Sequence, residues 1–412
     1  MCSSDLQKNT HMEHLEEIVF DGGVDGARQA INFLQTLRNS LAGWSQKKVN
    51  ATIKWDGAPA IFCGPDPADG KFFVAKKGIF NKKPILFKSI EEIDAGESRV
   101  DLANTFKAVY RGMKPLYDKG KLKDVVQGDF LFHAGTRQTK VVMGENCVLF
   151  KPQLIAYCIP DHDELYDAAK KCKVCVVIHA KYPGNGAKTV ADLSVNFGFD
   201  ASHLSTDDCL IISPFTSELG SSMALTPSEK SKLVNWKRAA RNLTPKVAPF
   251  VDMIAPEHTD NMGIAYLLKQ YFNARVREGQ KITSASRFYQ DFCAWYENKF
   301  RTKWEALKNP TAITKWKKKY CIGKAMLVDN KSEFINMVAL YNTIQNIKGI
   351  FIPKFEAGER FKTFYYNEDG TYEVGDQEGY VVVRESTNAV KIVQRLGGFS
   401  ERNFNEMKRW AK

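Results

Sequence analysis

The chain has 412 residues, of which 44% are apolar and 12% aromatic, so it can bury at least one sizeable core, and its length suggests two or three domains. No apolar run reaches the length of a membrane span, and the N-terminus lacks the basic start and apolar stretch of a secretory signal, so we expect a cytoplasmic protein with no membrane partner. The formal net charge is +12, and nine scattered cysteines favour reduced thiols over a disulfide framework.

The first half of the chain mixes helix and strand patterns. Apolar spacing of three and four predicts amphipathic helices over 24–43 and 98–113. The stretch 50–64 places one lysine, Lys54, in an apolar run that predicts a strand, and Asp-Gly with a chain reversal follows at once. We expect this lysine at the rim of a sheet, where a ligand can approach; the alternative is an ordinary edge-strand lysine. Further strands are predicted over 124–132, 145–159 and 207–214.

The whole charge excess lies in one segment. Residues 231–350 contain 21 Lys and Arg against 9 Asp and Glu, whereas the rest of the chain contains 38 of each. Apolar residues at helical spacing, with Ser, Thr or Asn near each start, predict an all-helical unit here. The predicted helices cover 225–243, 261–277, 284–307 and 331–347.

This helical segment has the features of a nucleic-acid-binding surface, because clustered cations attract phosphates and aromatic rings stack on bases. Its basic run comprises Lys315, Lys317, Lys318 and Lys319, and the interleaved aromatics are Trp236, Phe288, Tyr289, Trp295, Trp304 and Trp316. The alternative is that the rings form helix core and the lysines a solvated face. The one-sided charge of the whole segment favours contact with nucleic acid.

Strand patterns return over 370–384 and 388–396 and complete an ordered set of short motifs. In chain order the set is Lys54-Trp55-Asp56-Gly57, Lys76-Lys77-Gly78, Gly128-Asp129, Tyr157, Glu378-Gly379 and Lys391. This order resembles the covalent nucleotidyltransferase superfamily, which contains the polynucleotide ligases and the mRNA capping enzymes. More narrowly, the chain is similar to ligase-like proteins of tailed bacteriophages.

The resemblance implies an α+β fold of the ligase type, with antiparallel sheets, flanking helices and an ATP-grasp-like adenylation domain. We expect this domain in two parts, 1–224 and 348–412, with the basic helical domain inserted at 225–347. Most DNA ligases and capping enzymes carry an OB-fold after the catalytic domain, but only 21 residues follow Lys391. We therefore expect no C-terminal OB-fold, and the helical insertion to hold the nucleic acid in its place.

The resemblance also implies the reaction. The Lys54 amine would attack the α-phosphate of ATP to give lysyl-AMP and pyrophosphate, AMP would pass to a 5′-phosphate end, and a 3′-hydroxyl would displace it. The amine must be deprotonated, which nearby cations and partial desolvation encourage. The implied nucleotide pocket comprises Lys54, Asp56, Gly57, Lys76, Lys77, Asp129, Tyr157, Glu378 and Lys391.

The implied roles follow the charges of that reaction. Lys391, with Lys76 or Lys77, would stabilise charge on the α-phosphate. Asp129 and Glu378 would hold Mg²⁺, or Mn²⁺, and ribose hydroxyls. The ring of the tyrosine at 157 would stack on adenine.

The sequence therefore predicts an ATP-dependent polynucleotide ligase, a monomer acting on DNA or RNA ends or nicks. One alternative is a GTP-dependent capping-type guanylyltransferase. Another is a nucleic-acid-binding protein with a vestigial transferase pocket. The last motif commonly carries two lysines two apart, and the second place here is Val393, so Lys391 would act alone or with Arg395.

Overall fold

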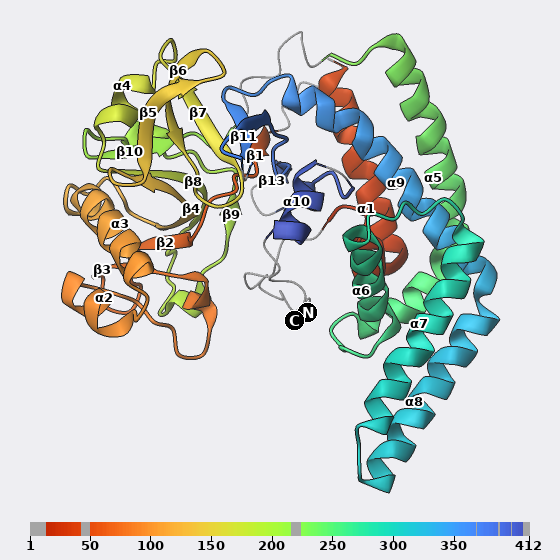
Figure 1. Cartoon of the computed structure of the whole chain (residues 1–412). Helices are drawn as coiled ribbons and strands as arrows, with labels where there is room; N and C mark the ends of the chain where they lie inside the picture. Colours follow the sequence, from red (N-terminus) through yellow and green to blue (C-terminus); the bar gives the residue numbers. More distant parts are fainter. Residues whose placement is uncertain are drawn as a thin grey trace. The chain divides into compact units, whose positions relative to one another are not determined.

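The computed structural model describes residues 14–42, 50–215, 224–367, 369–385, 388–396 and 398–406 (Figure 1). They form two compact units. The first unit takes its described residues from 50–220 and 355–391 and contains the sheets. The second takes them from 13–49, 221–354 and 392–412 and is helical. The chain is therefore a mixed α and β protein, as the sequence predicts at this level.

The first unit is built from short strands with a few helices. Its helices are α2 (Ile90–Gly96), α3 (Val100–Asp118) and α4 (Tyr166–Lys171). Its strands are β1 (Asn50–Ile53), β2 (Ala60–Pro65), β3 (Phe72–Ala75), β4 (Val125–His133), β5 (Arg137–Val142), β6 (Glu145–Phe150), β7 (Ala156–Pro160), β8 (Val174–Tyr182), β9 (Asn196–Phe197), β10 (Cys209–Ile212), β11 (Lys362–Tyr366), β12 (Tyr372–Val374), β13 (Tyr380–Glu385) and β14 (Asn388–Ile392).

These strands form three sheets. The largest has the order β10-β8-β4-β2-β3, with β9 beside β8, and it is antiparallel except for the parallel pair of β8 and β10. A second sheet has the order β12-β11-β7-β6-β5. The third is small, with the order β1-β13-β14, and it joins strands from the two ends of the first unit's sequence. Residues far apart in the chain therefore meet at β1 and β13.

Both faces of the six-stranded sheet are covered by apolar side chains. Ile61 and Cys63 of β2 pack in one core cluster with Phe106 and Met113 of α3. Phe62, which lies between them on the same strand, packs in a separate cluster with Tyr182. Successive strand residues point to opposite faces, so this alternation shows two buried faces. Two-sided burial explains why β2 and β8 read as nearly continuous apolar runs.

Helices make up most of the described part of the second unit. Its helices are α1 (Ile18–Leu41), α5 (Pro227–Ile254), α6 (Ile264–Arg277), α7 (Ala285–Glu305), α8 (Pro310–Asp329), α9 (Lys331–Glu356, which runs two residues into the first unit) and α10 (Gly398–Glu406). Side-chain caps fix several starts: Thr226 and Glu229 form a capping box on α5, Ser284 caps α7, and Asn309 caps α8. No helix in the described part of the chain combines the length and apolar character needed to cross a bilayer.

The second unit differs from the predicted helical domain in its extent. The prediction assigned the N-terminal helix and the residues after β14 to the sheet domain, but both belong to the helical unit. Aromatic packing supplies the physical reason for α1, because Phe20 lies 5.5 Å from Phe272 and 6.1 Å from Tyr341 between ring centroids. For the residues after β14 the reason is Arg395, which donates to the buried carboxylate of Glu17 at 3.0 Å.

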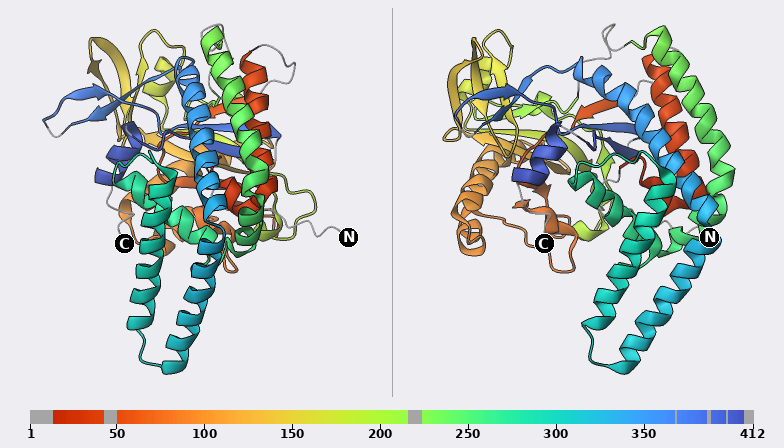
Figure 2. Two further views of the ribbon diagram at one scale, coloured as in Figure 1. Left: turned by 90° about the vertical axis from the view of Figure 1, so that its right-hand side faces the viewer. Right: turned by 45° about the vertical axis from the view of Figure 1, so that its right-hand side comes forward.

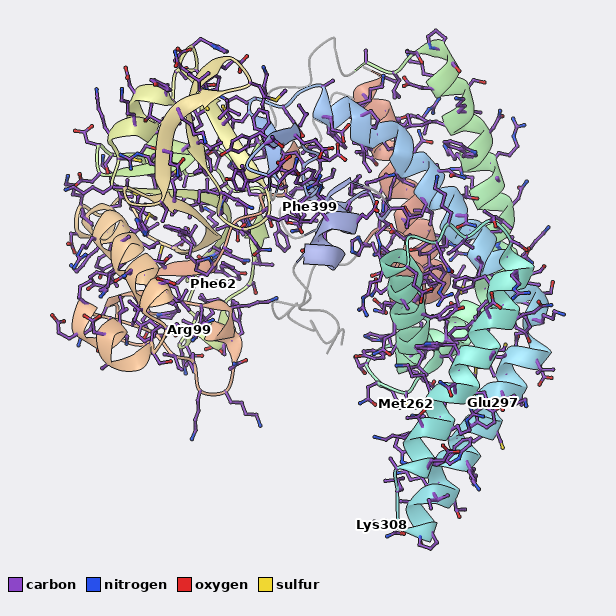
Figure 3. All side chains as sticks on the ribbon, viewed as in Figure 1. Phe62, Arg99, Met262, Glu297, Lys308 and Phe399 are labelled. Carbon is purple, nitrogen blue, oxygen red and sulfur yellow. The ribbon has the colours of Figure 1, made fainter. Side chains whose placement is uncertain are left out.

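Helix α8 is a second departure, because the sequence analysis placed only a basic run there. It pairs with α7 as a long antiparallel hairpin (Figure 2), with Lys308 at the connecting turn (Figure 3). Only Gly323 and Leu327 of α8 are buried, so its apolar stripe is narrow and the helical spacing is weak. The Asn309 cap and Pro310 at the first helical position are the signals that could have located it.

A close contact between β4 and β8 gives the first testable prediction. A Cβ added at Gly128 would lie 1.9 Å from the backbone oxygen of Val177 on β8, so Gly128→Ala forces the two strands apart. We expect a loss of about 1–3 kcal/mol in unfolding free energy, measured by denaturant or thermal unfolding. Gly184→Ala is the matched control, because an added Cβ there meets nothing within 4 Å. Equal stability of the two variants would contradict the contact.

Candidate functional site

Lys54 lies immediately beyond the end of β1, as the sequence predicts. Strand β1 pairs with β13 so that Ile53 stands opposite Tyr380, and the Lys54 amide donates to the Gly379 carbonyl at 2.9 Å (Figure 1). This register brings the residue before Gly379 next to the lysine. The Lys54 ammonium forms an ion pair with the carboxylate of Glu378, and both side chains are about one-fifth to one-quarter exposed. The first motif of the ordered set therefore meets the fifth, Glu378-Gly379.

The surroundings of Lys54 are acidic. Burial opposes its charge, but the carboxylates of Glu378, Asp129 and Asp56 outweigh burial and raise the pKa of Lys54 above its ordinary value. The proposed chemistry predicts nearby cations that favour the neutral amine. In this structure the carboxylates dominate instead, so the lysine rests as an ammonium.

Two glycines allow close approach on either side of Asp129: Gly57 lets the Lys54 loop approach β4, and Gly128 lets β4 approach β8. Ala60 of β2 stands opposite Asp129 of β4, and a Cβ added at Gly57 would lie 2.4 Å from the Asp129 Cβ. A Cβ at Gly128 would collide with β8 on the other side. The Asp-Gly and Gly-Asp motifs are therefore explained by close approach of backbone, which holds the Asp129 carboxylate beside Lys54.

A cavity of about 210 Å³ in the first unit opens beside these residues. Among its lining residues are Lys54, Lys77, Lys391 and Asp129, all named by the sequence analysis. Lys54 is balanced by its neighbouring carboxylates, and Lys77 and Lys391 add further positive charge to the cavity wall.

His179 also lines this cavity, and the sequence analysis missed it. It lies on β8, and its Nε2 is 3.6 Å from the Asp129 carboxylate. A single histidine in the apolar run VVIHA has no directly neighbouring polar residues in the sequence that would indicate a functional site. Only its pairing through β8 with β4 brings it beside the aspartate.

The two adjacent lysines of the second motif lie in different surroundings. Lys77 lines the cavity, and burial lowers its pKa. Lys76 forms an ion pair with the buried carboxylate of Glu97 at 2.8 Å and does not line the cavity. Neighbouring residues of an extended segment point in opposite directions, which separates the two side chains.

Asp56 does not line the cavity, but its side chain holds the turn that follows Lys54 in place. Its buried carboxylate accepts hydrogen bonds from the backbone amides of Leu154 at 2.6 Å and Ile155 at 2.8 Å. Burial raises the pKa of Asp56 to about 7. These bonds tie the turn after Lys54 to the segment before β7.

Tyr157 does not take the role that the resemblance implies. Its side chain is fully buried, and its ring lies 4.7 Å from that of Trp55 and 5.5 Å from that of Phe150. Its hydroxyl accepts a hydrogen bond from the Asp56 amide at 2.8 Å. Because the ring is covered by protein, it cannot stack on adenine here. Trp55 and Phe197 are the described aromatic residues that line the cavity, and the buried indole N–H of Trp55 finds no partner among the described residues.

Arg395, the second cation near the last motif, forms contacts within the second unit. Arg395 lies in the second unit, where it pairs with Glu17 and Asn273 and is buried. Lys391 is therefore the cation of this motif that lines the cavity.

Metal ligation was predicted for Asp129 and Glu378. Within the described ranges, no group of three or more His, Cys, Asp or Glu side chains is placed to hold a metal ion. Both carboxylates instead act on Lys54. Such a pair suits Mg²⁺ only when phosphate oxygens and water supply the other ligands.

The predicted basic run lies on α8. Lys315, Lys317 and Lys318 are exposed, whereas Lys319 pairs with Asp260. The predicted aromatics divide by burial. Phe288 and Tyr289 are core residues, and the tryptophans at 236, 295, 304 and 316 are half-buried.

Several lysines of the α7–α8 hairpin lie over these rings. The Lys299 ammonium is 4.9 Å from the Trp295 ring centroid, and that of Lys303 is 5.3 Å from Trp316. Cations packed on indole faces form a surface that is both basic and aromatic.

Comparison with known proteins gives one match. Neither the curated proteins nor the solved structures contain a match to this chain. A family model matches residues 9–408, which is nearly the whole chain and includes both units. The chain therefore belongs to the family described as a family of unknown function, DUF6267.

Proposed function

We propose that this protein is an ATP-dependent polynucleotide ligase that works through a lysyl-AMP intermediate on Lys54. The observation that carries the proposal is the cavity in which Lys54, Lys77 and Lys391 converge beside Asp129, from four separate segments of the sequence. Lys77 and Lys391 supply positive charge for a polyphosphate, and Lys54 can add its own where a bound metal ion engages Glu378 and Asp129. A ligase-type nucleotidyltransferase fold for the first unit is part of this proposal.

The lining residues fit a nucleotide in further ways. Trp55 offers an indole N–H without a partner among the described residues, and His179 and Gln127 offer polar edges. The volume of about 210 Å³ is below the roughly 300–1,000 Å³ of sites that enclose a drug-sized ligand. ATP would therefore place its reacting phosphate in the cavity and leave part of the molecule outside.

The Lys54–Glu378 ion pair defines the proton transfer. The Lys54 Nζ forms a bond to the α-phosphorus, the bond from that phosphorus to the bridging oxygen breaks, and pyrophosphate leaves with the electron pair. The amine must first lose a proton, and the paired carboxylate of Glu378 is its nearest acceptor. Lys77 and Lys391 stabilise the negative charge that grows on the phosphate.

Magnesium would be held by Asp129, and by the Glu378 carboxylate oxygen that does not take the Lys54 proton, together with phosphate oxygens and water. When bound, Mg²⁺ neutralises phosphate charge. Binding of Glu378 to the metal ion would also lower the pKa of Lys54, because Glu378 has the largest effect among the carboxylates that raise this pKa.

The second unit is proposed to bind the nucleic-acid ends. The segment 231–350 carries the whole net positive charge of the chain, and the exposed lysines of α8 lie beside half-buried tryptophans. The lysines would attract the phosphates of the strand, and the bases would stack on the tryptophan rings. Loading of AMP is assigned to the first unit alone.

Lys54→Ala should abolish covalent transfer of AMP, because it removes the proposed nucleophile. The measurement is retention of label through denaturation after incubation with Mg²⁺ and each α-labelled nucleotide. Lys76→Ala is the matched control, since Lys76 pairs with Glu97 away from the cavity. Label that persists on Lys54→Ala would disprove the assignment. Label from GTP alone would favour the capping-type alternative, and no label from any nucleotide would favour a vestigial pocket.

Glu378→Ala and Lys391→Ala should each slow AMP loading at least about a hundredfold, the loss expected when one charge-stabilising group is removed. Single-turnover kinetics of label transfer measures the effect. Lys362→Ala serves as control because its ammonium pairs with Glu145 on the second sheet. Circular dichroism verifies folding, and Glu378→Gln provides a less disruptive variant. Normal rates in the Glu378 and Lys391 variants would show that the last two motifs are misplaced.

Reversal of charge at Lys315, Lys317 and Lys318 should weaken nucleic-acid binding and leave AMP loading intact. Each single-strand phosphate contact contributes about −0.7 to the log-log slope of affinity against salt, so loss of three contacts should flatten the slope by about 2. Lys319 is spared because it pairs with Asp260. Fluorescence anisotropy at several salt concentrations gives the slope.

The matched control reverses Lys119, Lys121 and Lys123, three exposed lysines of the first unit. It makes the same change in net charge at another place. An equal effect of the two triple reversals would mean that net charge alone attracts the nucleic acid. A wild-type slope in the α8 variant would mean that its lysines form a solvated face.

A further inference from the structure

The second unit contains a cavity that the ligase proposal does not use. Its volume is about 580 Å³, within the range typical of small-molecule sites. Its walls come from α5, from the end of α6 and the residues after it, from α9, and from residues 394–396. All of these belong to the same unit.

The lining is basic and rich in amides. Its charged residues are Lys232, Arg275, Lys281 and Arg395, and no described lining residue is acidic. Its amide side chains are Gln280, Asn342, Gln345, Asn346 and Gln394. Cations attract a phosphate, and amides pair with the polar edges of a planar base.

Aromatic side chains also line the cavity, and two of them are buried and packed against each other. Phe272 and Tyr341 are buried and stacked, with ring centroids 4.0 Å apart. Trp236 of α5 lines the cavity and is half-buried. A half-buried indole presents a face on which a base can stack.

Arg275 is held in place at the wall. Its guanidinium donates to Glu278 at 2.8 Å and to Gln280 at 3.0 Å, and it lies 4.8 Å from the Tyr271 ring centroid. Its buried Nε has no hydrogen-bond partner among the described residues. The two terminal nitrogens of the guanidinium are therefore held by hydrogen bonds, and its Nε–H is a donor without a partner among the described residues.

We propose that this cavity binds one unpaired nucleotide of the nucleic-acid strand. The base stacks on Trp236, exposed amides such as Asn346 contact its edge, and the exposed lysines Lys232 and Lys281 contact the flanking phosphates. The volume admits one nucleotide and excludes a duplex. The inference rests on the proposed nucleic-acid role of the second unit, and adds a base-binding subsite to it.

Three variants test the subsite. Gly349 of α9 lines the cavity, and an added Cβ there meets nothing within 4 Å, so Gly349→Trp fills the space without a backbone clash. Trp236→Ala removes the stacking ring, and Trp236→Phe keeps one. Lys246→Ala, an exposed change on α5 outside the cavity, is the control. Thermal unfolding verifies that each variant is folded.

The probes are fluorescently labelled RNA and DNA single strands of about twelve nucleotides, and abasic strands of the same length. Anisotropy titration is done with whichever intact strand binds more tightly. Trp236→Ala and Gly349→Trp should weaken binding of the intact strand about five- to a hundredfold, the range for loss of one base stack. Trp236→Phe should recover most of the affinity. Binding of the abasic strand should be unchanged by Trp236→Ala.

Other results overturn the inference in distinguishable ways. If the cavity variants bind intact strand normally while the α8 charge reversal weakens binding, the subsite is wrong and the nucleic-acid role stands. If neither weakens binding, the nucleic-acid role fails with it. Equal losses for intact and abasic strands would exclude base stacking. Binding of free AMP, tested by calorimetry, that is as tight as strand binding and is lost in Trp236→Ala but kept in Lys54→Ala would assign the cavity to a mononucleotide instead.

Discussion

The ion pair of Lys54 and Glu378 is the interaction on which the proposed site depends. The two residues come from segments on either side of residues 221–354, and the β1–β13 ladder brings them together. A half-buried ammonium needs a nearby carboxylate, and loss of one partner would leave the other charge uncompensated. The ion pair therefore favours the pairing of β1 with β13. It also keeps the Lys54 amine protonated until a bound substrate changes the charges around Lys54.

Charge is also buried in the second unit, where it fixes the ends of the helical core. Lys348 donates to Glu16 at 2.7 Å, and Arg395 donates to Glu17 at 3.0 Å, with all four side chains buried. Burial lowers the pKa of Lys348 more than Glu16 raises it. Such pairs contribute little net stability but are costly to break, so they specify one arrangement of α1, α9 and the residues after β14.

Local patterns were enough to predict most strands, the helical character of 225–347 and the position of Lys54 at a strand end, because these follow from periodicity and turn residues near in sequence. They could not predict that Tyr157 is buried or that His179 meets Asp129, since both depend on which strands pair. The choice between Lys76 and Lys77 likewise needed the position of Glu97. The domain limits failed because α1 and Arg395 join the helical unit through contacts distant in sequence.

The proposed reaction requires that phosphates of a nucleotide occupy the cavity between Lys54, Lys77 and Lys391. A crystal structure of the protein with Mg²⁺ and a non-hydrolysable ATP analogue would show whether they do. We expect the α-phosphate beside the Lys54 Nζ, with Lys77 and Lys391 in contact with phosphate oxygens. An analogue bound only elsewhere, with Lys54 still paired to Glu378 and no phosphate in the cavity, would contradict it.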